Sequence, residues 1–389
     1  MKKLTSLFVM LLVSASAFAY TSNKIVIPDV EGYKTLKGDF HIHTVFSDGN
    51  VWPETRVREA VWEGLDILSI TDHIDTRSRK WIKNGIISDD CDRNTPYKLA
   101  RKLAARNGLL LINGGELSRR RPSGHTNVLF VKDNNKIVAE AEKFDNDNAK
   151  ATKAGLTEAR NQGAFIMWNH PHWEKYAPNK TVIGPVQKKL LKKGFFDAIE
   201  VYNGGCGYSP EAHDWCLKYN LAIMGCSDYH GPMFMNVDYK GGAHRVVTLV
   251  FAKEKSIKSV REAMDAKRTA IFVDDMIYGR EQELKLLFDA CIQVKDVKWG
   301  EKGISCTLEN VSSVPVRITK APGTEKYRYN RSFIIPPFST FRFSVQPLLD
   351  GNTSTKLDPS VKKIEANIFV ENFHVGANKP LKTAIKFEK

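Results

Sequence analysis

The sequence lacks the features that define several common classes of protein. Its six cysteines form no CxxC pair, which argues against a structural zinc knuckle. After residue 20 no segment is apolar enough to cross a bilayer, which takes about 20 helical residues, so no membrane span is expected. No repeat of about 20 to 50 residues and no low-complexity tract is visible.

Long basic blocks are also missing, although the net charge is +14. The lysines and arginines are dispersed, and they do not alternate with aromatic residues as in a nucleic-acid groove. We interpret most of them as a solvated surface. A surplus of this size still favours anionic ligands or anionic surfaces.

The first 20 residues, MKKLTSLFVMLLVSASAFAY, have the three parts of a secretory signal peptide. Lys2 and Lys3 supply positive charge, Leu7 to Val13 form a short apolar run, and Ala17-Phe18-Ala19 supplies a cleavage site. The run is too short for a membrane anchor. We therefore expect a signal peptide over residues 1–19 and an exported protein, periplasmic in a Gram-negative source and otherwise secreted. An oxidising compartment would permit disulfides, but spacing does not reveal their pairing.

Between residues 38 and 275, short apolar runs alternate with helical patterns. Pro53 stands where proline opens a helix, and Ser256 stands as an N-cap before Val260 and Met264. Such alternation predicts an α/β domain with parallel strands, either a doubly wound sheet or a barrel. We favour a barrel, because so many strands end in polar residues. The predicted strands are Asp39–His43, Asp66–Asp72, Leu109–Gly114, Asn127–Val131, Phe165–Asn169, Ala198–Tyr202, Ala222–Cys226 and Arg245–Phe251.

After about residue 290 the pattern changes to short strands separated by Gly, Pro, Asn and Ser. Helical periodicity is absent there. We predict a barrel domain over residues 24–290 and a small antiparallel β-sandwich, of unknown role, over residues 291–389.

The strongest chemical signal begins at Asp39-Phe40-His41-Ile42-His43. Residues i and i+2 of a strand point to the same face, so His41 and His43 can reach one metal ion. Further His, Asp and Glu residues stand at or just beyond later apolar runs, where the strands of a parallel barrel converge on one mouth. Six of the ten histidines belong to this set. Its members are His41, His43, Asp48, His73, Glu116, His125, His170, Asp228 and His230.

Imidazole and carboxylate ligands suit Mn, Zn or Fe. Nine candidate ligands exceed the needs of one metal ion, so two or three divalent ions are expected, with Glu116 placed to bridge two of them. Paired metal ions suit the hydrolysis of phosphate esters by a hydroxide that lies between them.

In this order, the motifs HIHTVFSDG, SITDH, GGE, GHTN, NHP and CSDYH resemble the PHP (polymerase and histidinol phosphatase) superfamily. The resemblance covers about residues 36–275. It implies a distorted (β/α)7 barrel with a trinuclear site. The signal peptide and the appended β-domain further resemble exported bacterial PHP phosphodiesterases, and no polymerase partner is expected.

The resemblance also implies how the ligands are shared. His41, His43, Glu116 and Asp228 would hold the first metal. Glu116 would bridge to a second, which His125 and His170 complete, and Asp48, His73 and His230 would hold the third. Asp72 resembles a residue that orients a ligand histidine, although a turn carboxylate is an equal alternative.

Three further residues are candidates for substrate binding. His172 could bind phosphate or protonate the leaving oxygen, and the alternative is a packed turn histidine. Arg245 and Arg119 could bind phosphate oxygens, and the alternatives are a structural ion pair and a solvated surface.

We therefore predict a metal-dependent hydrolase of small phosphate esters, with diesters favoured. A phosphomonoesterase like histidinol phosphatase is the alternative within the enzymes. A non-catalytic exported protein that binds metal or glycan is the alternative from another class.

Overall fold

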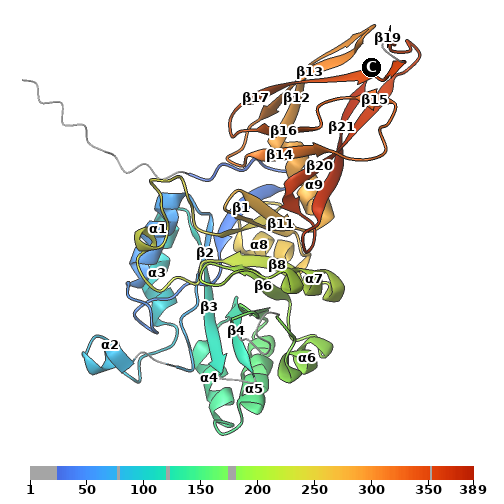
Figure 1. Ribbon diagram of the computed structural model, residues 1–389. Helices are drawn as coiled ribbons and strands as arrows, with labels where there is room; N and C mark the ends of the chain where they lie inside the picture. The colour runs from blue at the N-terminus through green and yellow to red at the C-terminus, as the bar shows by residue number, and fades with distance from the viewer. Residues whose placement is uncertain (1–23, 77–78, 120–122, 174–180, 351–352) are drawn as a thin grey trace, which may run out of the picture.

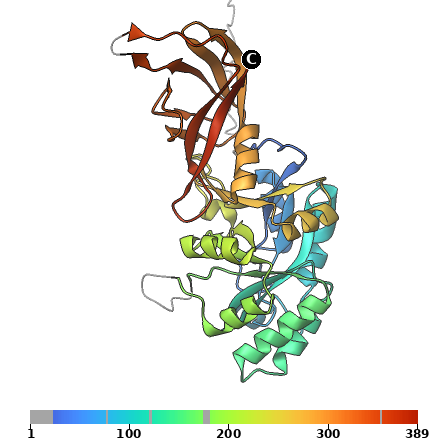
Figure 2. The ribbon, with the colours of Figure 1, turned by 90° about the vertical axis from the view of Figure 1, so that its right-hand side faces the viewer.

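The computed structural model describes residues 24–76, 79–119, 123–173, 181–350 and 353–389, so the expected signal peptide lies outside the described residues. The described chain has two parts, a mixed α/β part and a C-terminal part made of strands (Figures 1 and 2). None of the helices in the described ranges has the length and hydropathy needed to span a bilayer.

One sheet forms the centre of the first part. It has the order β9-β1-β2-β3-β4-β5-β6, with β8 on the other side of β6 and β10 beside β9. The bounds are β1 Lys34–Asp39, β2 Ile67–Ile70, β3 Leu110–Arg119, β4 Gly124–Leu129, β5 Phe165–Trp168, β6 Ala198–Asn203, β7 Gly207–Tyr208, β8 Ala222–Cys226, β9 Val247–Ala252, β10 Thr269–Val273 and β11 Met276–Gly279.

The sheet is rich in parallel pairs but not uniformly parallel. β1–β2, β2–β3, β5–β6 and β6–β8 are parallel, whereas β4 runs opposite to both neighbours and β9 runs opposite to β1. The expectation of parallel strands throughout was therefore wrong for β4 and β9. Only four residues separate β3 from β4, too few for the crossover that a parallel pair needs.

The sheet curls until β8 meets β9 and β10. The Thr248 hydroxyl accepts from the Gly225 N–H at 3.0 Å and donates to the Gly225 carbonyl at 2.8 Å, and the Thr269 hydroxyl accepts from the Ile223 N–H at 3.2 Å. A Cβ on Gly225 would lie 2.5 Å from the Ile271 side chain, so glycine permits this approach. Inside the curl lies a buried cluster to which all these strands except β10 contribute. It includes Leu36, Ile67, Ile112, Leu129, Phe165, Ala198, Met224 and Val250.

Helices cover the outside of the sheet. Pro53 begins α1, which ends at Gly64 in the left-handed region, and the Ser256 hydroxyl caps α8 by accepting from the Ser259 N–H, as predicted. The bounds are α1 Pro53–Glu63, α2 Arg79–Lys83, α3 Thr95–Arg106, α4 Asn134–Glu142, α5 Asn148–Asn161, α6 Pro185–Lys192, α7 Pro210–Tyr219, the 3-10 turn η1 Met233–Met235, α8 Ile257–Asp265 and α9 Glu281–Cys291.

The C-terminal part consists of antiparallel strands that share apolar side chains. β12, β13, β17 and β15 form one sheet, and β16, β14, β20 and β21 lie across from it. The Phe343 ring of β17 lies 5.6 Å from Phe333 of β16 and 6.4 Å from Phe387 of β21. The bounds are β12 Ile292–Gly300, β13 Gly303–Asn310, β14 Val316–Lys320, β15 Tyr327–Arg328, β16 Ser332–Ile335, β17 Thr340–Pro347, β18 Leu349–Asp350, β19 Thr353–Ser354, β20 Lys363–His374 and β21 Pro380–Glu388.

The two parts are joined by hydrogen bonds between strands and by a common apolar core. β20 pairs in parallel with β11, and one apolar cluster runs from Val57 of α1 through Leu287 of α9 to Phe387 of β21. At the N-terminal side, Val26 exchanges hydrogen bonds with Ser313. The C-terminal strands therefore brace the first part (Figure 1).

Candidate metal centre

The two histidines of the HxH motif lie directly after β1 on a backbone held by two neighbours. The His43 N–H donates to the Tyr229 carbonyl at 3.2 Å, and the Asp228 N–H donates to the His41 carbonyl at 2.7 Å. Both rings are fully buried, with centroids 5.2 Å apart, while Ile42 between them points into the core. The alternation of an extended chain therefore places both rings on one side, as predicted.

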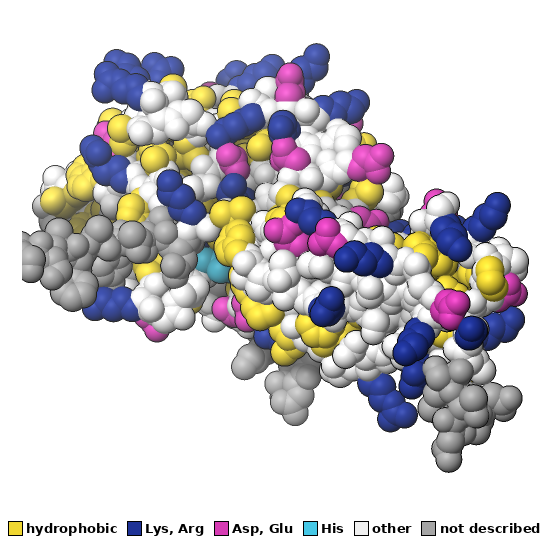
Figure 3. Space-filling view, turned by 90° about the horizontal axis from the view of Figure 1, so that it is seen from above, with side chains coloured by type: hydrophobic (Ala, Val, Ile, Leu, Met, Phe, Trp, Pro, Cys, Tyr) yellow, Lys and Arg dark blue, Asp and Glu magenta, His cyan; other side chains and the backbone are white. Residues whose placement is uncertain are grey.

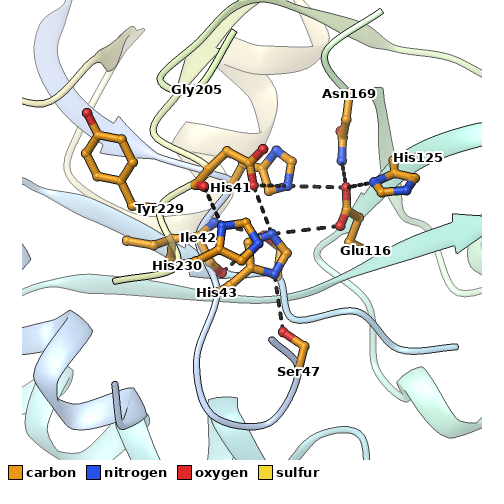
Figure 4. A network of polar contacts seen from close by, with 12 residues as sticks. His41, Ile42, His43, Ser47, Glu116, His125, Asn169, Gly205, Tyr229 and His230 are labelled. Atoms are coloured by element: carbon orange, nitrogen blue, oxygen red, sulfur yellow. Dashed lines mark hydrogen bonds and ion pairs between the residues drawn. The ribbon is translucent and has the colours of Figure 1, made fainter. Parts of the chain in front are cut away.

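Glu116 of β3 lies between His125 and His41 (Figure 4). Its Oε1 lies 3.1 Å from His125 Nδ1, 3.3 Å from His41 Nε2 and 3.6 Å from His170 Nε2. Its Oε2 lies 2.6 Å from His73 Nδ1. Because β4 is antiparallel, its first residues, including His125, reach the end of the sheet where β1, β2 and β5 finish.

Asp228 follows β8 with a φ of 53°, a conformation that L residues seldom adopt. Its Oδ1 lies 3.0 Å from His43 Nε2 and 3.2 Å from His41 Nε2, and its Oδ2 lies 4.0 Å from His170 Nε2. The unusual backbone turns the carboxylate toward the histidines. Such strain persists only where the surroundings hold it, and it is common at functional sites.

The third part of the cluster is more open. Asp48 contacts His230 Nε2 at 3.2 Å and His73 Nε2 at 3.3 Å, and half of its side chain is exposed. The rings of His230 and His43 stack with centroids 4.3 Å apart. Figure 3 shows histidine in a recess on the face seen there. Within the cluster the His230 side chain is 38% exposed, so this part of the cluster is open to solvent.

All nine predicted ligands fall into groups that could hold a metal ion. Within each group one donor atom per residue lies within 4.8 Å of the others. The groups are His43, Asp48, His73 and His230; His41, His43 and Glu116; His41, His170 and Asp228; and His73, Glu116 and His125. Glu116 belongs to two groups, as a bridging carboxylate would, but His41, His43 and His73 are also shared.

A buried unpaired atom shows that the donor set fits metal ions. His41 Nε2 makes no hydrogen bond, although it points between Glu116 and Asp228 at 3.3 and 3.2 Å. A buried nitrogen without a partner is costly unless a cation or another group completes it. Imidazole nitrogens facing carboxylates are the donor set expected for Zn, Mn or Fe.

The charges of the cluster influence one another strongly. Burial acts to lower the pKa of His41, but Asp228, Glu200 and Glu116 raise that pKa well above its usual value. Burial acts to raise the pKa of Glu116, but His125, His73 and His41 hold it well below. The pKa of Asp228 is likewise lowered, by His41, His43 and His170, despite burial. The carboxylates therefore stay ionised, as metal binding requires.

Asp72 holds the loop that follows the HxH motif. Its carboxylate accepts from the Thr44 N–H, the Thr44 hydroxyl and the Ser47 hydroxyl, each at 2.6 Å, and the Ser47 hydroxyl lies 3.3 Å from His43 Nδ1. Asp72 thus contacts His43 only through Ser47, which is compatible with the predicted orienting role.

Sequence reasoning missed three buried polar residues that contact the ligands. Asn169 Nδ2 donates to Glu116 Oε1 at 2.7 Å, and Asn203 Nδ2 donates to Asp228 Oδ2 at 3.0 Å. Glu200 lies 3.1 Å from His41 Nδ1. The available signal was the carboxylate of Glu200 inside the apolar run AIEV of β6, since a buried carboxylate needs a partner.

Arg245, predicted as a candidate for substrate binding, is held in a buried ion pair, which was the alternative given for it. Its fully buried guanidinium donates to Asp39 at 3.0 Å and from Nε to Glu63 at 2.9 Å, and Nη2 also pairs with Glu63. The chain straightens into β9 only at Val247, and this turns Arg245 toward α1.

The two other substrate candidates also have protein partners. Arg119 pairs with Asp75 at 2.9 Å and Asp145 at 3.0 Å. His172 Nε2 lies against the Cys206 carbonyl, while its Nδ1 is buried without a hydrogen bond. Trp173, which is 56% exposed, packs its ring 5.2 Å from His125 and 5.4 Å from His170 at the edge of the cluster.

A solved structure shares this architecture over nearly its whole length. It is a two-domain protein from Bacteroides vulgatus that contains a predicted PHP-like metal-dependent phosphoesterase. The two chains are 36% identical, the match covers 94% of this chain and 99% of the other, and the TM-score is 0.82. The chain belongs to the PHP-like metal-dependent phosphoesterases, which confirms the resemblance seen in the motifs.

Two other structures are more distant. A protein from Bifidobacterium adolescentis assigned as a metal-dependent phosphoesterase is 17% identical, covers 50% of this chain and 88% of its own, and has a TM-score of 0.37. PsfC from Pseudomonas syringae is 16% identical, covers 66% and 96%, and has a TM-score of 0.38. No protein-family model and no curated protein matches the chain.

Proposed function

We propose that the protein hydrolyses phosphate diesters at the nine-residue cluster, with two or three divalent metal ions. The observation that carries this proposal is the convergence of all nine predicted ligands on one end of the sheet. In this proposal the first part is the distorted (β/α)7 barrel and the C-terminal part is the β-sandwich, with the boundary near residue 290.

We assign the ligands as three sets. His41, His43, Glu116 and Asp228 would hold one ion, Glu116 with His125 and His170 a second, and Asp48, His73 and His230 a third. When bound, such ions would supply a hydroxide nucleophile near neutral pH and neutralise charge on the transferred phosphoryl group. Mn, Zn and Fe all suit these donors.

The chain's own residues orient this site. Asn169 restrains Glu116, Asn203 restrains Asp228, and Asp72 restrains the Ser47 loop beneath His43. Burial of these partners excludes water from the side of the cluster opposite the solvent, which strengthens every charge interaction there. His172 is retained as a candidate proton donor because its Nδ1 is buried and unpaired.

The preference for diesters is supported by the ion pairs that two arginines predicted for substrate binding make with carboxylates of the protein. A monoester carries more negative charge than a diester and would favour an additional free cation. Of the two arginines proposed for substrate, Arg245 is buried against Asp39 and Glu63, and Arg119 is held by Asp75 and Asp145. Arg120 and Arg121 lie outside the described residues.

The proposal includes export of the chain, because residues 1–19 have the pattern of a signal peptide. Detection of the protein in a periplasmic extract, with an N-terminus near residue 20, is the test of this part.

The activity is tested with purified protein stripped of metal and reloaded with Mn²⁺ or Zn²⁺. Hydrolysis of bis-p-nitrophenyl phosphate should vanish with the metal and return on reloading, and should exceed hydrolysis of mono-p-nitrophenyl phosphate. Faster turnover of the monoester would instead favour the phosphomonoesterase. No turnover of either ester with any metal would contradict the proposal that the protein is a phosphoesterase.

A further inference from the structure

Glu200 is a fully buried carboxylate that lies behind the metal centre and belongs to none of the groups that could hold a metal ion. It is near the end of β6, whose neighbours are β5 and β8. These two strands lead to His170 and Asp228. Glu200 therefore lies between the elements that supply these two ligands.

Both oxygens of Glu200 are already used within the protein. Oε1 lies 3.1 Å from His41 Nδ1, and Oε2 accepts from the His170 N–H at 2.8 Å and from Asn203 Nδ2 at 3.1 Å. Asn203 Nδ2 also donates to Asp228. One carboxylate is thus connected directly to two ligand histidines and through one amide to a ligand carboxylate.

The contact with His41 determines which ring nitrogen carries the ligand lone pair. Because a carboxylate can only accept, Nδ1 must carry the hydrogen in this pair. Nε2 then provides the lone pair, and it is the unpaired atom that points between Glu116 and Asp228. The opposite tautomer would aim an N–H at the metal position and prevent binding.

The contact with His170 holds a strained backbone. His170 has a φ of 23°, which L residues rarely adopt, and its N–H would be buried without a partner if Glu200 were absent.

We propose that Glu200 is a positioning residue of the metal centre, which fixes the tautomer of His41 and the backbone of His170. This inference rests on the ligand set of the proposed function. Partners of this type typically change metal affinity by about 10–100-fold.

Glu200→Gln is an informative substitution because the amide keeps the shape but cannot accept with both ends. If its oxygen accepts from His41 Nδ1, its NH2 faces the His170 N–H and Asn203 Nδ2. If it is turned, its NH2 faces His41 Nδ1 and favours the wrong tautomer. Either orientation therefore loses the acceptor for His41 Nδ1 or the acceptor for the His170 N–H.

The experiment titrates metal-free protein with Co²⁺ and records the visible absorption bands, the stoichiometry and the dissociation constants by chelator competition. Glu200→Gln should weaken the tightest binding about 10–100-fold and alter the bands at saturating Co²⁺. The matched control is Glu283→Gln on α9, another buried carboxylate, far from the cluster in the sequence and in no potential metal group. It should leave both readouts unchanged.

Unchanged affinity and unchanged bands in Glu200→Gln would overturn the proposal. If that variant does not fold, Glu200→Asp replaces it, since the shorter carboxylate keeps its charge but cannot reach both histidines. It should also weaken Co²⁺ binding, and wild-type binding would overturn the proposal. Failure of the wild type to hydrolyse esters would end the proposed function but leave this Co²⁺ comparison intact.

Discussion

The protein contains two buried clusters of charged side chains a few residues apart in sequence, and they are completed in different ways. In the Arg245 cluster, which comprises Arg245, Asp39 and Glu63, the guanidinium has carboxylate oxygens as partners on Nε, Nη1 and Nη2. In the metal cluster, which comprises the nine predicted ligands, His41 Nε2 is buried and points toward Glu116 and Asp228 without a hydrogen bond.

The difference distinguishes an ion-pair cluster with a structural role from a cluster that can bind a metal ion. Arginine cannot bind a metal ion, and its donors match two carboxylates, so the Arg245 cluster is complete within the chain. Histidine offers a lone pair, and carboxylates around it attract a cation. The two clusters are also linked, because Asp39 accepts from the Ser227 N–H and hydroxyl beside Asp228.

The largest expected effect is the loss of a ligand from the metal cluster. Asp228→Ala should lower the rate of diester hydrolysis by more than about 100-fold, since even partners outside the ligand set cost about 10–100-fold. Metal content measured by mass spectrometry should fall together with the rate.

Asp289→Asn, an exposed residue that pairs with Lys285 on α9, is the control and should change neither value. If Asp228→Ala hydrolysed esters normally, the metal assignment would be wrong.

Breaking the Arg245 cluster should affect stability first. Arg245→Met leaves Glu63 and Asp39 buried without their cation, which should cost about 3–5 kcal/mol of unfolding free energy. Urea denaturation measures this loss. The KM for a diester should stay close to that of the wild type, because the guanidinium does not face the metal cluster.

A variant of normal stability with a strongly raised KM would show instead that Arg245 contacts substrate. That result would restore the interpretation made from the sequence.

Removing the metal ions should lower the free energy of unfolding of the protein, and the Arg245 cluster should stay intact. Ligand binding to the folded state stabilises it by about 2.7 kcal/mol per site at 100 times the dissociation constant. Thermal unfolding with and without chelator should therefore differ, and Arg245→Met should show the same difference. Equal melting temperatures in the wild type would contradict metal binding by the folded chain.

The sequence was sufficient to predict that the nine candidate ligands come together, because each stands in a short motif at or just beyond one end of an apolar run. The chain direction of β4 was predicted wrongly, since apolar runs have no direction; the signal that was not used is that His125 stands at the start of its run. The sequence left substrate binding and an ion pair open for Arg245, because sequence proximity to Asp228 does not reveal which way a side chain turns before β9. Glu200 was missed because its partners His170 and His41 lie in the segments after β5 and β1, and only the folded sheet brings them together.

His213 of α7 extends the comparison to a buried histidine that has no carboxylate hydrogen-bonded to it. Its Nδ1 lies 2.9 Å from the Tyr208 hydroxyl and its Nε2 lies 3.2 Å from the Gly279 carbonyl. Burial lowers its pKa to about 4, opposite to the shift of His41. The folded state therefore favours the neutral ring.

Because this pKa is lower in the folded than in the unfolded protein, the stability that it provides is present above about pH 6.5 and is lost as the pH falls toward 4. Between pH 7 and 5.5 the loss through this residue should be about 1 kcal/mol. Urea denaturation of wild type and His213→Gln at both pH values, in excess chelator, isolates this contribution. The variant should lose less stability on acidification than the wild type. Equal losses would mean that His213 is protonated in the folded state, and the contrast with the metal cluster would then not extend to it.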